Sequence, residues 1–215
     1  MRKHLGFTLA EVLITLGIIG VVAAMTIPTL MSNTGKSEMK SGFKKVISAL
    51  NQAVTMSVAV DYTDFSDTTG TGVADNSIYS LLSSRMQVTS VGGRDSVANT
   101  NASTMGVTSG NYTLFFSDGM ALSYSSTAKG CTTKSPCKAL IDVNGAKKPN
   151  KLANCQINIS GGTTSNTATS DNSIADSGTT CTENNAYIAD QYSVVLRGQQ
   201  VVPNGHAARY VLYDN

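Results

Sequence analysis

A long apolar segment opens the pattern of this chain. From Phe7 to Leu30 the only charged side chain is Glu11. As a helix these residues rise about 36 Å, which exceeds the roughly 30 Å hydrocarbon core of a bilayer. The pattern predicts a membrane-spanning helix over residues 7–31. A charge at bilayer depth costs at least about 2.5–3.5 kcal/mol, so Glu11 is expected to have a partner.

The pattern changes after residue 31, where apolar residues recur at three- and four-residue steps. This spacing predicts an amphipathic continuation of the same helix over residues 32–60, packed on the rest of the chain. Pro28 is expected to bend or locally open the helix, because proline lacks a backbone donor and clashes with the preceding turn. The predicted apolar stripe consists of Phe43, Val46, Ile47, Leu50, Val54 and Val58.

Shorter segments with strand and turn signals follow from residue 61 to residue 215. Residues 112–116 and 120–124 flank Asp118-Gly119 and predict a hairpin. The order of a long helix followed by strands predicts an α+β fold, with the helix packed on a mostly antiparallel sheet. Further predictions are a short helix over 76–86, strands over 139–143, 155–159, 191–196, 200–202 and 209–213, and polar loops over 90–110 and 160–182.

The first residues fit an unusual export signal. A basic leader with Arg2 and Lys3 ends at Gly6, and the apolar helix follows the Gly6-Phe7 junction instead of preceding a cleavage site. This block, with Thr8, Leu9, Glu11 and Pro28, resembles the signature of type IV pilins and type II secretion pseudopilins. The resemblance implies that a prepilin peptidase removes residues 1–6 and that Phe7 is N-methylated.

The resemblance also implies how such a chain works. Glu11 would pair with the Phe7 amine of a neighbouring subunit in a helical filament, and this pairing would set the axial register because either charge alone is unfavourable in an apolar surrounding. The implied partners are like subunits, membrane lipid before assembly, an assembly ATPase and a platform protein. The implied location is the bacterial cytoplasmic membrane as a single-pass protein with an extracytoplasmic head, and then a pilus or pseudopilus.

Charge narrows the choice of partner little. The chain has 16 Lys and Arg against 14 Asp and Glu, and loss of Arg2 and Lys3 with the leader leaves 14 against 14. Net charge therefore favours neither nucleic acid nor an acidic partner. Lysines on both flanks of the apolar segment also leave its orientation open to simple counting.

The four cysteines all lie beyond the apolar segment, and an even number in an exported domain predicts two disulfides. Three pairings are possible. We favour Cys131–Cys137, which closes a small loop, and Cys155–Cys181, which closes a Thr/Ser/Asn-rich stretch. A zinc site is disfavoured, because there is no Cys-x-x-Cys and His206 is the only histidine nearby.

The head has weak binding signals and no catalytic constellation. Asp142 and Asn144 offer oxygen ligands for calcium, although Asp-x-Asn-Gly more often forms an Asx turn. Lys147, Lys148 and Lys151 form a candidate nucleic-acid patch, and solvated lysines are the plainer interpretation. We therefore predict a structural filament subunit that is not an enzyme and needs no cofactor. The alternatives are a minor or competence pilin whose head binds DNA, a surface or calcium, and a lone anchored protein.

Overall fold

The computed structural model describes residues 6, 8–92, 111–145, 147, 150–159, 162–166, 181 and 186–213. The chain divides into two compact units, residues 1–38 and residues 39–215. Helix α1, Leu9–Asp61, contributes to both. The second unit, called the head below, therefore includes the C-terminal part of α1 as well as all the strands.

The N-terminal unit consists of the first part of α1. Its side chains are exposed almost throughout, including those of Leu13, Ile14 and Ile19. The helix is long and apolar enough to cross a membrane. It is continuous through Pro28, so the expected local opening is absent from this structure of a single chain. Opening or stretching of this region on assembly stays a prediction.

In the head, α1 packs by the face that the sequence predicts. Phe43, Val46, Ile47, Leu50 and Val54 are buried, and only Val58 of the predicted stripe is half-exposed. The ring of Phe43 stacks on Tyr192 with centroids 4.2 Å apart. This stripe joins apolar side chains of the sheet in a continuous core.

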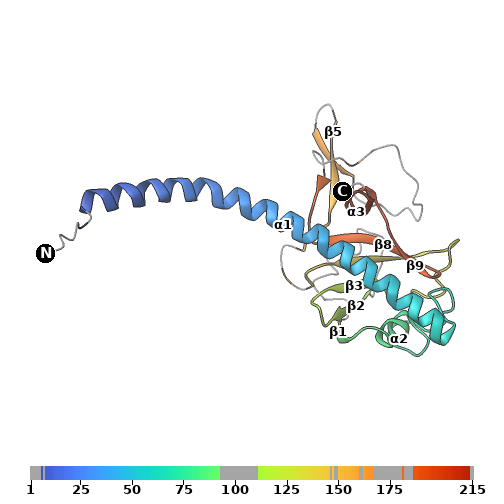
Figure 1. The fold of residues 1–215 in the computed structure, drawn as a ribbon. Coiled ribbons are helices and arrows are strands. Elements are labelled where there is room, and N and C mark those ends of the chain that lie inside the picture. The colour runs from blue at the N-terminus through green and yellow to red at the C-terminus, as the bar shows by residue number, and fades with distance from the viewer. Residues whose placement is uncertain are drawn as a thin grey trace. The chain divides into compact units, whose positions relative to one another are not determined.

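The head contains a six-stranded antiparallel sheet, in the spatial order β1-β2-β3-β4-β8-β9 (Figure 1). The predicted hairpin is confirmed as β2 and β3, with Gly119 in the turn at a φ of 85°. This α+β architecture is the predicted one. The strands are β1 Val88–Gly92, β2 Asn111–Phe116, β3 Ala121–Ser125, β4 Cys137–Asp142, β8 Gln191–Arg197 and β9 Gln200–Pro203.

The outer edge of β9 is held by α1. The Asn51 side chain donates to the Val201 carbonyl oxygen at 3.1 Å and accepts from the Val201 amide at 2.8 Å. One amide side chain thus pairs with an edge strand as another strand would. The arrangement satisfies two backbone groups that an edge otherwise leaves unpaired.

A second sheet lies between β4 and β8 in the chain, in the order β6-β5-β7. Its strands are β5 Asn154–Ile159, β6 Gly162–Asn166 and β7 Ala186–Tyr187. The prediction of a loop over 160–182 is wrong for 162–166, because this polar segment pairs with β5 through its backbone. The loop predicted over 90–110 is likewise wrong at its start, where β1 continues to Gly92. Residues 93–110 and 167–180 lie outside the described residues.

The last predicted strand is also wrong. Residues 209–213 belong to helix α3, His206–Tyr213, which follows a turn at Gly205. Its buried residues are Ala207, Ala208, Tyr210 and Val211, a spacing that fits one helical face and not strand alternation. The β-prone Tyr and Val side chains misled the prediction, because burial on a helical face outweighs their local preference.

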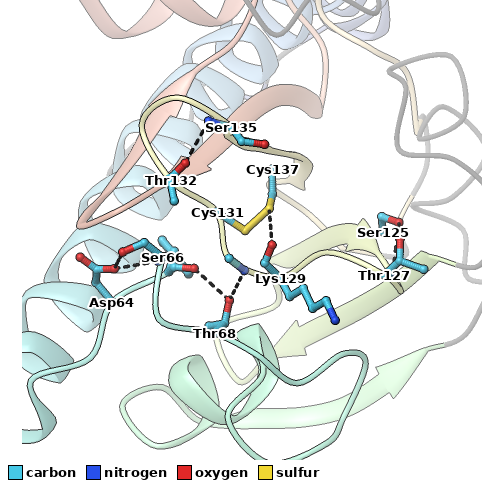
Figure 2. Close-up of a disulfide and its surroundings, with 12 residues drawn as sticks. Asp64, Ser66, Thr68, Ser125, Thr127, Lys129, Cys131, Thr132, Ser135 and Cys137 are labelled. Carbon is cyan, nitrogen blue, oxygen red and sulfur yellow. Dashed lines mark hydrogen bonds between the residues drawn. A yellow bond between two sulfur atoms is a disulfide. The ribbon is translucent and has the colours of Figure 1, made fainter.

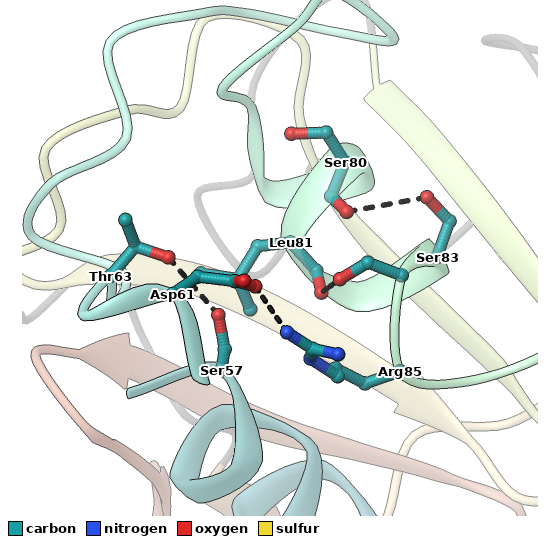
Figure 3. A network of polar contacts seen from close by, with 8 residues as sticks. Ser57, Asp61, Thr63, Ser80, Leu81, Ser83 and Arg85 are labelled. Atoms are coloured by element: carbon teal, nitrogen blue, oxygen red, sulfur yellow. Dashed lines mark hydrogen bonds and ion pairs between the residues drawn. The ribbon is translucent and has the colours of Figure 1, made fainter. Parts of the chain in front are cut away.

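Helix α2, Ile78–Ser83, lies near the C-terminal end of α1 (Figure 3). It is shorter than predicted and begins at Ser77, whose hydroxyl caps the Ser80 amide. Asp61, the last residue of α1, forms an ion pair with Arg85 just beyond α2. The hydroxyls of Ser57 and Thr63 are hydrogen-bonded at 3.1 Å in the same network.

The loop after α1 is tied to the first disulfide loop (Figure 2). The Gly130 amide donates to the Thr68 hydroxyl at 2.9 Å, and the Cys131 amide donates to the Phe65 carbonyl at 2.9 Å. Cys137 Sγ lies 3.9 Å from the Lys129 carbonyl oxygen, which is a contact only, since a disulfide sulfur carries no hydrogen. These bonds fix the end of the head at which α1 terminates.

Candidate processing and assembly site

The site at the start of α1 is built from Thr8 and Glu11. The Thr8 amide and the Thr8 hydroxyl each donate to Glu11 Oε2 at 2.8 Å. In return the Glu11 amide donates to the Thr8 hydroxyl at 3.3 Å. This reciprocal arrangement is a capping box, which satisfies amides that the first helical turn leaves without partners.

The capping box also orients the Glu11 carboxylate. Both bonds from Thr8 reach Oε2, and among the residues that the structure describes none donates to Oε1. Oε2 therefore holds the side chain against the helix start, while Oε1 can accept a hydrogen bond from a cationic group outside the chain. The sequence prediction named Glu11 but missed Thr8 as its partner. The Thr-x-x-Glu spacing was the signal that could have found it.

The predicted cleavage residues, Gly6 and Phe7, lie just before this box in the chain. Gly6 is exposed, and Phe7 lies outside the described residues. Residues 1–5 of the leader are outside them too. From Leu9 onward the helix surface is apolar and exposed, with 79% exposure at Leu9 and 61% at Leu13. A surface of this kind is stable only in lipid or against other apolar helices.

Comparison with known proteins assigns this segment. Residues 1–27 match the family model described as the prokaryotic N-terminal methylation motif. The N-terminal segment is a prepilin methylation motif. The motif covers Gly6, Phe7 and Glu11 and ends just before Pro28, so the resemblance recognised from the sequence is confirmed for this part of the chain.

A curated relative extends the likeness beyond the methylation motif. The chain is 36% identical over 56 residues to the type II secretion system core protein G of Vibrio cholerae. The matched stretch is 26% of this chain and 38% of the relative, so the chain is aligned to less than half of that protein's length. No solved structure matches the chain significantly.

The head contains the two favoured disulfides. Cys131 is bonded to Cys137 and Cys155 to Cys181, and no cysteine is free. The first bridge closes a short loop beside the end of α1. The second joins β5 to the segment before β7 and so holds the small sheet together. All four thiols are thereby removed as metal ligands or nucleophiles.

The predicted calcium ligands lie in a buried turn after β4. Asp142 is fully buried, and its carboxylate accepts from Gln191 Nε2 at 2.8 Å and from the Asn144 amide at 3.1 Å. The Asx turn weighed against calcium is therefore present. Burial raises the pKa of Asp142 to about 7, and the nearby Asp190 carboxylate adds to the rise, while the bond from Gln191 opposes it.

Asp190 is a structural residue that the sequence prediction missed. It is fully buried and accepts from the Asn150 and Lys151 amides at 2.6 and 2.7 Å, and from Asn144 Nδ2 at 3.2 Å. It therefore anchors the turn that leaves β4. Within the described residues, no group of three or more His, Cys, Asp or Glu side chains is placed to hold a metal. Calcium binding stays a prediction.

The candidate nucleic-acid patch is described in part. Lys147 and Lys151 are exposed on the turn after β4, and Lys148 lies outside the described residues. His206, expected at a surface turn, is the half-exposed first residue of α3. DNA binding by the head stays a prediction.

Proposed function

We propose that this protein is a structural subunit of a type IV pilus-like or type II secretion pseudopilus filament. It is made as a prepilin, cleaved after Gly6 and N-methylated at Phe7. It is stored in the bacterial cytoplasmic membrane through the N-terminal part of α1, with the head on the extracytoplasmic side. An assembly ATPase and a platform protein then draw it into a filament of like subunits.

A single observation carries this proposal. Glu11 is the one charged side chain in an exposed apolar helix, and it follows the Gly6-Phe7 junction within the methylation motif. Cleavage after Gly6 creates a new ammonium at Phe7, one helical turn from the carboxylate. The Phe7 ammonium of one subunit would reach Glu11 Oε1 of its neighbour. The pair would neutralise two charges, each of which is costly alone in an apolar surrounding.

The head supports the proposed orientation. Two disulfides indicate an oxidising compartment, because disulfides persist outside the cytosol. The proposed work is mechanical: apolar helices leave lipid and pack on one another, and Glu11 selects their register. Similarity to a type II secretion protein over 56 residues supports a pseudopilus as well as a pilus.

Mass spectrometry of the native protein tests the proposed processing. The mature chain should begin at Phe7, carry one added methyl group on the terminal nitrogen and lack four hydrogens through cystine formation. A Gly6→Asp variant, whose side chain does not fit a peptidase site built for glycine, should retain residues 1–6. It should still lack four hydrogens, because both disulfides form independently of cleavage. A wild-type product that still begins at Met1 would overturn the proposal.

A further inference from the structure

Lysines gather at the end of α1 that enters the head, whereas acids and bases are mixed at its other end. At one end α1 enters the head near Lys40, Lys44 and Lys45. At the other end, about 32 Å away along the helix, the loop after Asp61 holds further acids. The acidic residues of that far end are the exposed Asp61, Asp67 and Asp75 and the half-exposed Asp64, and Asp61 is paired with Arg85.

Two contacts bring turns of the sheet to the lysine-rich end of α1. Lys45 Nζ lies 3.4 Å from Asp118 Oδ2 in the β2–β3 turn. Val143, in the turn after β4, packs against Gly42 of α1. A Cβ added to Gly42 would lie 3.2 Å from the Cβ of Val143.

Two more contacts complete this end of the head. A Cβ on Gly145 would lie 2.6 Å from the Gly119 carbonyl oxygen, so the two turns touch. The Lys40 ammonium lies 5.3 Å from the centre of the Tyr210 ring in α3. The turn after β4 therefore brings its own lysines to the same end. The basic end of the head is defined here as Lys40, Lys44, Lys45, Lys147 and Lys151.

The acids near the basic end do not cancel it. Asp118 is engaged by Lys45, and its side chain is 30% exposed. Asp142 and Asp190 are fully buried and bonded to amides, so they present no carboxylate to solvent. Glu38 is the only acid of α1 between residues 12 and 60. Positive charge thus dominates the exposed groups there.

We propose that the basic end of the head binds the anionic phospholipid headgroups of the membrane that holds α1. Chain connectivity places it there. Lys40 follows Leu30, the end of the apolar segment, by ten residues, or about 15 Å of helix. The headgroup layer extends about 5–7 Å beyond the hydrocarbon core, which brings its phosphates to within about a Debye length, 8–10 Å, of these lysines.

The contact gives the unassembled subunit a preferred pose. Lysine stems can lie along apolar surface while their ammonium groups reach phosphate. The Lys40 ammonium itself lies over the Tyr210 ring, at this same end of the head. This inference rests on the membrane-anchored state in the proposed function, and it adds the headgroup as a partner that extraction into a filament must release.

Energy transfer from a single tryptophan to a headgroup dye tests the contact. The chain has no tryptophan, and Ser117 is exposed in the β2–β3 turn beside Lys45, so Ser117→Trp gives one reporter. The full chain is reconstituted in vesicles of phosphatidylcholine, with or without phosphatidylglycerol, that contain a dansyl-labelled lipid. Transfer should rise with phosphatidylglycerol and fall again at high salt.

Charge variants locate the effect. K147E/K151E should raise the phosphatidylglycerol fraction needed for half-maximal transfer by about fivefold or more, as expected for loss of lysines near an anionic surface. K147R/K151R should behave as wild type. The matched control K129E/K134E, which reverses two exposed lysines at the far end of α1, should leave transfer unchanged.

Other outcomes would overturn the proposal. Equal transfer in neutral and anionic vesicles would exclude the headgroup contact, as would an equal loss in K129E/K134E. A transfer that depends on protein density would assign the basic end to a second copy. Capture of duplex DNA through Lys147 and Lys151, without any lipid effect, would assign it to nucleic acid. Failure of the chain to float with vesicles would instead overturn the anchoring in the proposed function.

Discussion

The two units of this protein differ in where their apolar side chains go. In the N-terminal unit nearly every apolar side chain is exposed, and Glu11, the acid within its apolar segment, is held by its own helix turn. In the head the apolar stripe of α1 is buried against the sheet, and the buried Asp142 and Asp190 are bonded within the head. The head therefore completes its interactions alone, while the N-terminal unit needs lipid or other subunits.

The sharpest way to break this comparison is to shorten one side chain in each unit. Phe43→Ala removes a buried ring stacked on Tyr192 and should lower the free energy of unfolding by about 3–5 kcal/mol. Ile14→Ala, at a residue with 63% exposure, should change it by less than about 0.5 kcal/mol. Urea unfolding in detergent, followed by near-UV circular dichroism, measures both. Equal losses would show that the N-terminal helix is part of the folded core.

The second test concerns Glu11, the acid within the apolar segment of the N-terminal unit. Glu11→Ala should insert in the membrane but weaken subunit association by about 3–5 kcal/mol, because it leaves the Phe7 ammonium of the neighbour unpaired in an apolar surrounding. Filament yield after shearing measures the effect, and Thr15→Ala is the matched control within the same helix. Normal filaments from Glu11→Ala would contradict the register role.

The disulfides allow a graded test within the head. Cys155–Cys181 joins residues 26 apart, and Cys131–Cys137 joins residues 6 apart. Loop-closure entropy predicts a loss of about 3.5 kcal/mol for C155S/C181S and about 2.4 kcal/mol for C131S/C137S. Thermal unfolding of the two variants ranks them. The reverse order would mean that the short bridge does more than close its loop.

The buried carboxylate after β4 predicts how the head responds to pH. The pKa of Asp142 is raised to about 7 in the folded head, from about 4 when unfolded. The folded state therefore binds more protons between these values, so the stability that Asp142 contributes is complete below pH 4 and falls as pH rises to 7, by on the order of 3 kcal/mol. Asp142→Asn should flatten this slope in urea unfolding from pH 4 to 7. An unchanged slope would assign the effect to another group.

The smallest effect should come from the edge of the main sheet. Asn51→Ala removes both bonds to Val201 and should cost about 1–3 kcal/mol, because two backbone groups lose their partner. Hydrogen exchange at the Val201 amide should speed up accordingly. Gln52→Ala, an exposed neighbour on α1, is the control and should leave that amide protected.

Patterns with a strong period or a strong chemical signature predicted well. The apolar run, the stripe from Phe43 to Val54 and the Asp118-Gly119 hairpin were confirmed because each depends on local spacing. The prediction of a strand over 209–213 is wrong because Tyr and Val are common in strands but also pack well on a buried helix face. The strand at 162–166 was missed because its pairing relies on backbone bonds that polar side chains do not reveal.

The sequence by itself determined that an acid sits in a membrane-length apolar helix directly after a Gly-Phe junction. That information is local, because one helix turn and one charge are enough to define it. Only the tertiary structure decided that Thr8 holds one oxygen of Glu11, that Asp190 anchors the turn after β4, and that lysines from α1 and that turn meet at one end of the head. The Thr8 contact is local and its spacing was readable, but the other contacts join residues far apart in the chain, whose pairing depends on how the backbone returns.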